Sequence, residues 1–300
     1  VPSFTFVSTV NAFVLRGARP VFIDIRPDTL NLDERHLERL VNERTKAVVP
    51  VHYAGVGCEM DTITTIAQKK GIKIVEDNAH GLFGTYKNKP LGTFGAFATQ
   101  SFHETKNITC GEGGALVINS PEYIERAEFI REKGTNRKKF FRGEIDKYTW
   151  IDIGSSYLPS DVLAAFLYSQ LEISEEIQKK RRFIWEFYQY NLRDWAAEHS
   201  IRLPHVPEYC NQPYHMFYLI LPCQELRDKL IAFLRKRSIH SVFHYLPLHL
   251  SEAGRHYADN SASCPVTEEM SSRLIRLPFF NALQESELEY IVSQIRSFQW

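Results

Sequence analysis

Apolar residues in the first third of the chain form short β-branched runs separated by helical patterns. The runs lie at 20–25, 47–53 and 72–79, and their composition suits strands that are buried on both faces. Between them, apolar residues recur at helical spacing over 32–41 and 60–71, and the second pattern ends at a glycine. This alternation predicts an α/β sheet with helices on both faces. In such sheets, ligands bind at the carboxyl ends of the strands.

Two further apolar runs, at 96–102 and 114–120, are separated only by a short loop. The loop is too short for a helical crossover, so we expect the two strands to be antiparallel or separated in the sheet. The chain then becomes strongly helical over 160–173 and 177–192, which indicates a long or bent connection between domains.

The C-terminal part changes to a strand–helix–strand–helix order. The predicted strands cover 216–222 and 241–249, and the last predicted helix covers 285–300. This order is typical of a small α+β domain. We therefore expect a large domain over 1–175, followed by a linker helix and a small domain over 176–300.

Composition excludes several classes of protein. The 36 basic and 36 acidic residues balance, so neither nucleic acid nor a membrane surface is an expected partner. The five scattered cysteines contain no CxxC pair, which argues against a disulfide framework or a zinc site and for a cytoplasmic location. No apolar run reaches the roughly 20 residues of a membrane span, and no signal peptide is visible.

The chain opens without Met on VPSFTFVSTVNAFVL, a pattern typical of a strand end that leads into a helix. Either the chain is processed or trimmed, or an N-terminal portion of the fold is absent.

Two charged residues stand where apolar runs end. A strand-end aspartate such as Asp77 is most often a turn residue, but it can also hold a cationic ring nitrogen. Lys106 follows a buried-type strand in a loop of small residues that leads into GEGG, and a partly desolvated lysine acts as a nucleophile or a base. Pyridoxal phosphate enzymes combine such an aspartate with such a lysine.

Other motif-like stretches do not match their templates. HETKN at 103–107 begins like the zinc motif HExxH, but Asn107 replaces the second histidine. GTFGAF and GSSYL lack the G-x-S-x-G pattern of a nucleophile elbow, and GEGG is not a P-loop. We therefore expect no metal site and no serine hydrolase.

Four longer stretches resemble one family. PSFTFVSTVNAFVLRGARPVFIDI, VPVHYAG, VEDNAHG and SFHETKNITCGEGGALVIN resemble the DegT-type sugar-nucleotide aminotransferases. The stretch REKGTNRKKFFRGEIDKYTWIDIGSSYLPSDVLAA is similar to the members that aminate TDP-4-oxo-6-deoxyglucose for enterobacterial common antigen, a surface polysaccharide. The resemblance implies an aspartate-aminotransferase-like pyridoxal phosphate fold of type I. Its large α/β domain would be N-terminally incomplete here, and its small C-terminal domain would be α+β.

The resemblance also implies roles for individual residues around pyridoxal 5'-phosphate. Lys106 matches the Schiff-base lysine and Asp77 the partner of the pyridine nitrogen. His80 occupies the family's Gln/His position beside the ring. Ser101 matches a phosphate ligand, and Phe6 matches the aromatic residue that stacks on the pyridine face.

Further positions concern the substrate and a second subunit. The resemblance places His103 near the cofactor or the substrate. Tyr245 and His249 match a segment that approaches the sugar nucleotide, with ordinary domain packing as the alternative. Ser156 stands where much of the family has an asparagine that reaches the cofactor phosphate of the neighbouring subunit, and a serine hydroxyl can also donate a hydrogen bond. The resemblance therefore implies a homodimer.

The implied reaction moves an amino group from glutamate to the C4 ketone of a nucleotide-linked 4-keto-6-deoxyhexose, TDP-4-keto-6-deoxyglucose. Three alternatives stay open. The substrate could be a 3-keto or UDP-linked sugar, or the chain could be a non-catalytic remnant or a binding module. A dehydratase is less expected, because dehydratase relatives replace the lysine with histidine and Lys106 is present.

Overall fold

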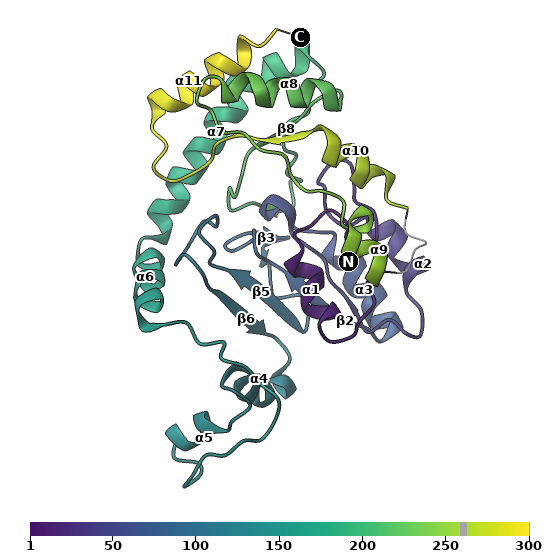
Figure 1. The fold of residues 1–300 in the computed structure, drawn as a ribbon, viewed down its shortest axis with the longest axis vertical. Helices are drawn as coiled ribbons and strands as arrows, with labels where there is room; N and C mark the ends of the chain where they lie inside the picture. The colour runs from purple at the N-terminus through teal and green to yellow at the C-terminus, as the bar shows by residue number, and fades with distance from the viewer. Residues whose placement is uncertain (259–262, 300) are drawn as a thin grey trace.

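The computed structural model describes residues 1–258 and 263–299. A mixed four-stranded sheet lies at the centre of the first half of the chain, in the order β1-β2-β5-β6 (Figure 1). Strand β2 is parallel to β1 and β5, and β5 is antiparallel to β6. The predicted α/β sheet and its antiparallel pair are thereby confirmed. The bounds are β1 Ala47–Val48, β2 Lys73–Asp77, β5 Phe97–Ser101 and β6 Gly114–Ile118.

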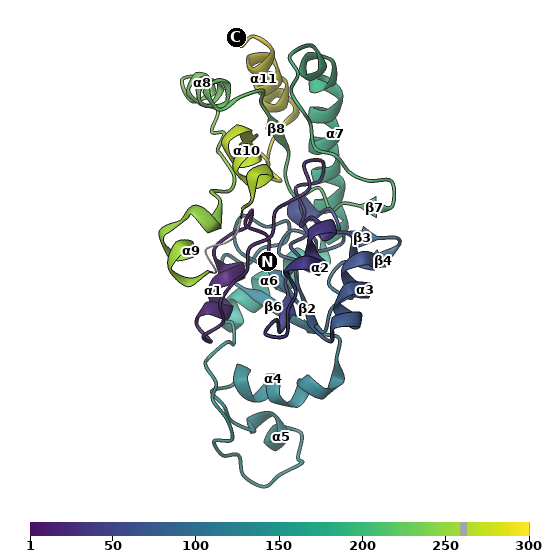
Figure 2. The same ribbon diagram turned by 90° about the vertical axis from the view of Figure 1, so that its right-hand side faces the viewer.

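Helices flank these strands, and in Figure 2 the strands lie between α1 and α3. The predicted helix at 60–71 is α3, which buries Ile63 and Ile66 and ends at Gly71 in the left-handed conformation (φ 65°). The helices are α1 Ser8–Val14, α2 Leu37–Leu40, α3 Met60–Lys70, α4 Ile124–Arg131, α5 Arg137–Phe141, α6 Asp161–Glu172, α7 Ser174–Glu198, α8 Gln224–Arg235, α9 Glu252–Tyr257, α10 Pro265–Arg273 and α11 Glu285–Arg296.

The run at 20–25 differs from its prediction. It forms two isolated bridges, one from Ile23 to Pro2 and one from Ile25 to Leu32, and no continuous strand. Pro2 has no backbone N–H, so the pairing with Ile23 cannot extend into a regular ladder. Asp24, between the two bridges, instead accepts hydrogen bonds from the start of α10.

The C-terminal half contains a two-stranded antiparallel sheet. Strand β8 (Tyr218–Ile220) lies within the predicted strand at 216–222 and pairs with β9 (Leu274–Arg276), whereas the predicted strand at 241–249 does not form. That stretch contributes a single bridge from Val242 to Arg276 and then a 3-10 helix at Leu248–Leu250. A third small sheet joins β3 Thr85–Tyr86, β4 Lys89–Pro90 and β7 Cys210–Asn211.

The long helix α7 runs from the region beside the sheet to α8 and α11 (Figure 1). Its buried side chains, among them Ile184, Tyr188 and Leu192, share one face and pack in a core with β8, β9 and α11. By contrast, α6 buries none of its residues although eight of its twelve residues are apolar. Among the described residues, no helix combines the length and apolarity that a membrane crossing requires.

Candidate active site

Lys106 lies in the loop that joins β5 to β6. Backbone hydrogen bonds close the loop, from Phe102 to Gly113 (2.8 Å) and from Cys110 to Phe102 (2.9 Å). Burial lowers the pKa of Lys106 to about 8, the Asp77 carboxylate opposes this shift, and the positive charge of Arg276 adds to it. A substantial fraction of the amine is therefore neutral near physiological pH.

Asp77 is the last residue of β2, next to β5 in the sheet, where it is paired with Thr99. Its Oδ2 accepts a hydrogen bond of 2.6 Å from the Thr9 hydroxyl of α1, and its Oδ1 accepts one of 3.1 Å from the Ala79 amide. Thr9 is itself bonded to Thr5 at 2.8 Å. These contacts fix the orientation of the carboxylate at the strand end, on the side of Lys106.

His80 follows in the same strand-end loop and is buried. Its ring stacks on His215 with 4.2 Å between centroids, and its Nδ1 accepts from the Ala54 amide at 3.3 Å. Its Nε2 lies 3.5 Å from the Tyr245 hydroxyl. Burial, together with the charge of Lys106, holds the pKa of His80 well below its usual value. The ring is therefore neutral and acts through hydrogen bonds and packing.

Three residues that the sequence-based reasoning missed extend this cluster. His215 Nδ1 lies 2.8 Å from Oδ1 of Asn107, the neighbour of Lys106, and Asn107 donates to the Pro213 carbonyl at 2.6 Å. These bonds tie the lysine loop to the C-terminal half of the chain. His244 lies 3.0 Å from the Tyr53 hydroxyl, and burial lowers the pKa of His244 to about 2. The adjacency of Asn107 to Lys106 was the one signal that the sequence offered.

The remaining candidates for binding the cofactor or the substrate differ in how deeply they are buried. Ser101 ends β5 at the same sheet edge, half-buried, and its Oγ accepts from the His103 amide at 3.4 Å. The His103 ring is more exposed and lies 3.0 Å from the Thr105 hydroxyl. Phe6 is exposed, with its ring centroid 6.4 Å from that of Tyr245. Phe6 and His80 thus both lie beside Tyr245 of the C-terminal half, whereas the contacts of Ser101 and His103 stay within the lysine loop.

His249 and Ser156 make their contacts elsewhere. The nitrogens of His249 lie 2.6 Å from the Ser3 hydroxyl and 3.1 Å from Glu268. Ser156 is exposed and its backbone pairs with Glu132, next to α4 and beyond the end of the sheet. In the part of the chain that the structure describes, neither side chain contacts Lys106 or Asp77.

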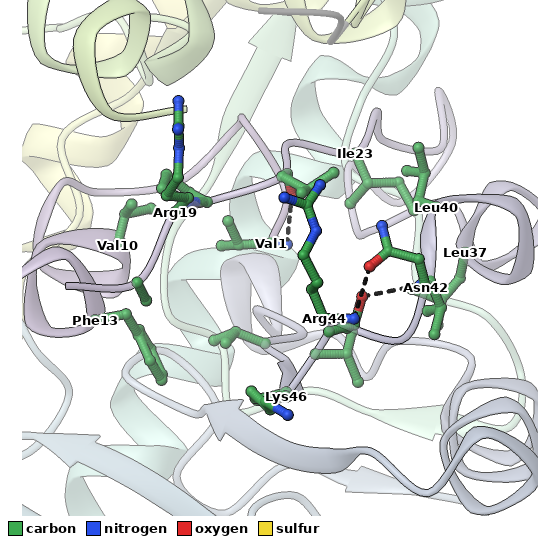
Figure 3. A pocket seen from close by; sticks show the side chains of 18 of the residues that line it. Val1, Val10, Phe13, Arg19, Ile23, Leu37, Leu40, Asn42, Arg44 and Lys46 are labelled. Atoms are coloured by element: carbon green, nitrogen blue, oxygen red, sulfur yellow. Dashed lines mark hydrogen bonds between the residues drawn. The ribbon is translucent and has the colours of Figure 1, made fainter. Parts of the chain in front are cut away.

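A cavity of about 540 Å³ is separate from this site (Figure 3). Apolar side chains such as Val10, Phe13 and Ile23 line it together with Arg19 and Arg44. Lys106 and Asp77 do not line the cavity. Thr9 connects the cavity to the site, because it borders the cavity and donates a hydrogen bond to Asp77. The cavity is therefore separate from the strand ends that carry Lys106 and Asp77.

The groups at the strand ends suit pyridoxal phosphate. An amine whose pKa is lowered to about 8 suits attack on the cofactor carbonyl. The Asp77 oxygens each accept a single protein hydrogen bond, so a lone pair stays available for a pyridinium N–H. The Ser101 hydroxyl can donate a hydrogen bond to a phosphate, and the exposed ring of Phe6 can stack on an aromatic ring.

Comparisons with known proteins agree with this chemistry. The profile of the DegT/DnrJ/EryC1/StrS aminotransferase family matches residues 1–296. The aminotransferase TlmJ from Streptoalloteichus hindustanus is 30% identical, with a TM-score of 0.88 over 99% of this chain and 77% of TlmJ.

Two further solved structures are similar. PseC from Helicobacter pylori, an aminotransferase of pseudoaminic acid biosynthesis, is 28% identical, with a TM-score of 0.89 over 98% of this chain and 77% of PseC. The PLP form of Spr1654 from Streptococcus pneumoniae is 26% identical, with a TM-score of 0.89 over 99% of this chain and 79% of Spr1654. The chain belongs to the DegT/DnrJ/EryC1/StrS aminotransferase family and is a pyridoxal-phosphate-dependent sugar aminotransferase.

Proposed function

We propose that the enzyme transfers the amino group of glutamate to the C4 ketone of a nucleotide-linked 4-keto-6-deoxyhexose, with TDP-4-keto-6-deoxyglucose as the sugar nucleotide. The observation that carries the proposal is the buried amine of Lys106, with its pKa lowered to about 8, near the oriented carboxylate of Asp77. The role of the product in enterobacterial common antigen or another surface polysaccharide belongs to the same proposal.

In this proposal the chain's own residues divide the work at the cofactor. Pyridoxal phosphate, when bound, supplies a carbonyl that takes up the amine and a ring that accepts electrons. Lys106 holds the cofactor and moves the proton from Cα of the donor, because its neutral amine is a base. Asp77 holds the proton on the ring nitrogen. Ser101 donates to the phosphate, while Phe6 and His80 confine the ring.

We assign the sugar nucleotide to His103, Tyr245 and His249. His103 is exposed enough to meet a ligand at the rim of the site. The Tyr245 hydroxyl lies beside His80, and burial raises the pKa of Tyr245, so it stays protonated and can donate to a sugar oxygen. His249 would have to exchange its hydrogen bond to Glu268 for one to the nucleotide.

We further propose a homodimer in which Ser156 reaches the cofactor phosphate of the partner subunit. The support is the number of exposed apolar side chains on α6 and on the stretch before it. Val162 (78% exposed), Phe166 (52%) and Trp150 (78%) are among them, and large exposed apolar surface is typical of a protein interface. Light scattering at micromolar concentration tests the dimer, and Val162→Asp is expected to shift it toward monomers.

We also propose that a boundary near residue 175 separates a large domain (1–175) from a linker helix and small domain (176–300). The support is a core drawn entirely from residues 184–298. The cysteines are free thiols, four of them buried, which supports a cytoplasmic location for the enzyme.

The test mixes the purified protein with pyridoxal phosphate, glutamate and TDP-4-keto-6-deoxyglucose and detects the aminosugar nucleotide by mass spectrometry. We expect product from the wild type and from Lys229→Ala, which removes an exposed lysine of α8, and none from Lys106→Ala. Parallel reactions with UDP-linked and 3-keto sugars test the substrate. Faster product formation from either would replace the TDP-4-keto assignment, and equal activity of Lys106→Ala would reject the role of the lysine.

A further inference from the structure

His215 is a neutral ring that carries its proton on Nδ1. Burial holds the pKa of His215 well below its usual value, and the nearby His80 and Lys106 act in the same direction, so only one ring nitrogen is protonated. Nδ1 lies 2.8 Å from Oδ1 of Asn107, whose amide nitrogen donates to the Pro213 carbonyl at 2.6 Å. Oδ1 is therefore an acceptor, and His215 donates to the residue that follows Lys106.

His80 carries its proton on the other nitrogen. Its Nδ1 lies 3.3 Å from the Ala54 amide, which can only donate, so the proton of this neutral ring is on Nε2, beside the Tyr245 hydroxyl. The rings of His80 and His215 stack, with 4.2 Å between their centroids and 19° between their planes. The His215 ring therefore covers one face of His80 and fixes the plane in which its Nε2–H points.

The backbone on both sides of this stack is strained. Ala54 and Tyr214 have φ angles of 54° and 53°, in the left-handed region that residues with a side chain rarely adopt. Gly55 packs so closely that a Cβ there would come within 2.4 Å of Pro213 and 2.8 Å of the His80 carbonyl oxygen. Such strain persists only where the surrounding structure fixes it, and it gathers at functional sites.

Arg181 of α7 holds the strained turn from the side opposite to Asn107. Its side chain is buried and donates to the carbonyls of Tyr214 and His215 at 3.0 and 2.6 Å, and to Oδ1 of Asn281 at 3.0 Å. The turn that precedes β8 is thus bonded to α7 and to the lysine loop. His215 cannot move without breaking one of these bonds.

We propose that His215 is a positioning residue, which places Lys106 through Asn107 and holds the plane of His80 through its ring face. This inference rests on the proposed role of Lys106 in transamination. His215 acts through the neighbours of the lysine and not on the reacting atoms. Misplacing a reacting group by about 1 Å can slow a reaction about a hundredfold. Loss of the Asn107 bond should therefore lower kcat, while KM for glutamate stays nearly unchanged, because no group that binds the donor is removed.

Two variants separate the two contacts of His215. His215→Asn places an amide nitrogen near the position of Nδ1 and removes the ring, whereas His215→Phe keeps a ring and removes the donor. We expect His215→Phe to lower kcat about tenfold, as for the loss of one hydrogen bond, and His215→Asn to lower it by less than about threefold. KM for glutamate should change by less than about threefold in both. His240→Phe, which removes an exposed histidine of the C-terminal half, is the control and should match the wild type.

A double-mutant cycle tests the route through Asn107. Asn107→Ala should lower kcat at least as much as His215→Phe, because it also removes the bond to Pro213. Adding His215→Phe to Asn107→Ala should lower kcat no further, since the shared hydrogen bond is already broken. Losses that multiply would show that the two side chains act independently, and would overturn the inference.

Nitrogen NMR of histidine-labelled apoenzyme gives a readout that does not depend on catalysis. We expect a neutral Nδ1–H ring for His215 and a neutral Nε2–H ring for His80. Both are assigned through the backbone resonances of the wild type, so the result does not depend on the folding of a variant. An Nε2–H ring at His215 would overturn the inference, because such a ring cannot donate to Asn107.

The kinetics can also contradict the inference. Wild-type kcat in His215→Phe, or an equal loss in His215→Asn and His215→Phe, would exclude positioning through the Nδ1–H donor. Wild-type enzyme that forms no aminosugar would instead reject the proposed function, whereas an active wild type with an unaffected His215→Phe would reject this inference alone.

Discussion

The two faces of β2 carry neighbouring carboxylates with opposite uses. Glu76 is completely buried and accepts four hydrogen bonds, from His52 Nε2 at 2.9 Å and from the amides of Gly92, Phe94 and Gly95 at 2.7–2.8 Å. Asp77, one residue later, accepts one hydrogen bond on each oxygen. Glu76 therefore has no capacity left for a ligand, whereas Asp77 does.

Position on the strand therefore decides which of the two acids can accept a hydrogen bond from a ligand. Side chains alternate between the faces of a strand, so Glu76 points into the loop at 92–95 and Asp77 points toward α1 and Lys106. Burial alone would raise the pKa of Glu76, but the hydrogen bonds from His52 and the backbone amides hold it below its usual value. Glu76 thereby stabilises the loop at 92–95 that precedes β5, whereas Asp77 keeps acceptor capacity for a ligand.

The largest expected effect is that of Asp77→Asn on catalysis. A neutral amide cannot keep the ring nitrogen of the cofactor protonated, so we expect kcat to fall by about a thousandfold or more. The free energy of unfolding of the apoenzyme should change by less than about 1 kcal/mol, since two partially exposed hydrogen bonds are affected. Steady-state kinetics and urea unfolding measure the two quantities, and a retained kcat would show that Asp77 has no role at the cofactor.

Glu76→Gln should show the reverse pattern. The substitution places an amide NH2 among donors, and we expect the free energy of unfolding to fall by about 3 kcal/mol. The effect should diminish below about pH 4.5, because a lowered pKa gives stability that is present above the unfolded value and lost as the pH falls through the folded one. Urea unfolding at pH 7 and pH 4 tests this; equal losses at both would contradict it.

Thr9→Val tests the orientation of Asp77 with a smaller change. The variant keeps the shape of the side chain but removes the 2.6 Å hydrogen bond to Oδ2. We expect kcat to fall by about tenfold, as for the loss of one hydrogen bond to a charged group. Thr65→Val, which removes an exposed hydroxyl within α3, is the matched control. Identical kinetics for the two variants would show that Thr9 does not position the carboxylate.

The smallest expected effect concerns the pH at which apoenzyme takes up pyridoxal phosphate. The rate of incorporation should rise as the pH passes through about 8, because the neutral form of Lys106 reacts. Asp77→Asn removes a charge that raises the pKa of Lys106 and should shift the midpoint downward. Arg276→Gln removes a charge that lowers it and should shift the midpoint upward. Unshifted midpoints would show that the charges of Asp77 and Arg276 do not change the pKa of Lys106.

The sequence predicted the sheet because its apolar runs are local patterns. Asp77 and Lys106 follow strong apolar runs, and the strand-end rule then brings them together. The sequence pattern gave no sign of β9, because this strand of three residues, Leu274–Arg276, directly follows a helix and has no periodicity of its own. Arg276 was missed for the same reason.

The histidine cluster shows a second limit. His215 and His244 lie near His80 only because β8 and the bridge from Val242 to Arg276 carry them there. Such long-range pairing leaves no spacing signal in a single chain. Family resemblance supplied His249 and Ser156, and within one chain their contacts lie away from the lysine.

We propose that Lys106 is the residue that binds the cofactor. The most direct measurement is to load the protein with pyridoxal phosphate, reduce it with borohydride and locate the pyridoxyl group by peptide mass spectrometry. We expect one modified site, at Lys106, in the wild type, in Glu76→Gln and in Asp77→Asn alike. A pyridoxyl group on another lysine, or an unmodified Lys106 in folded wild-type protein, would contradict it.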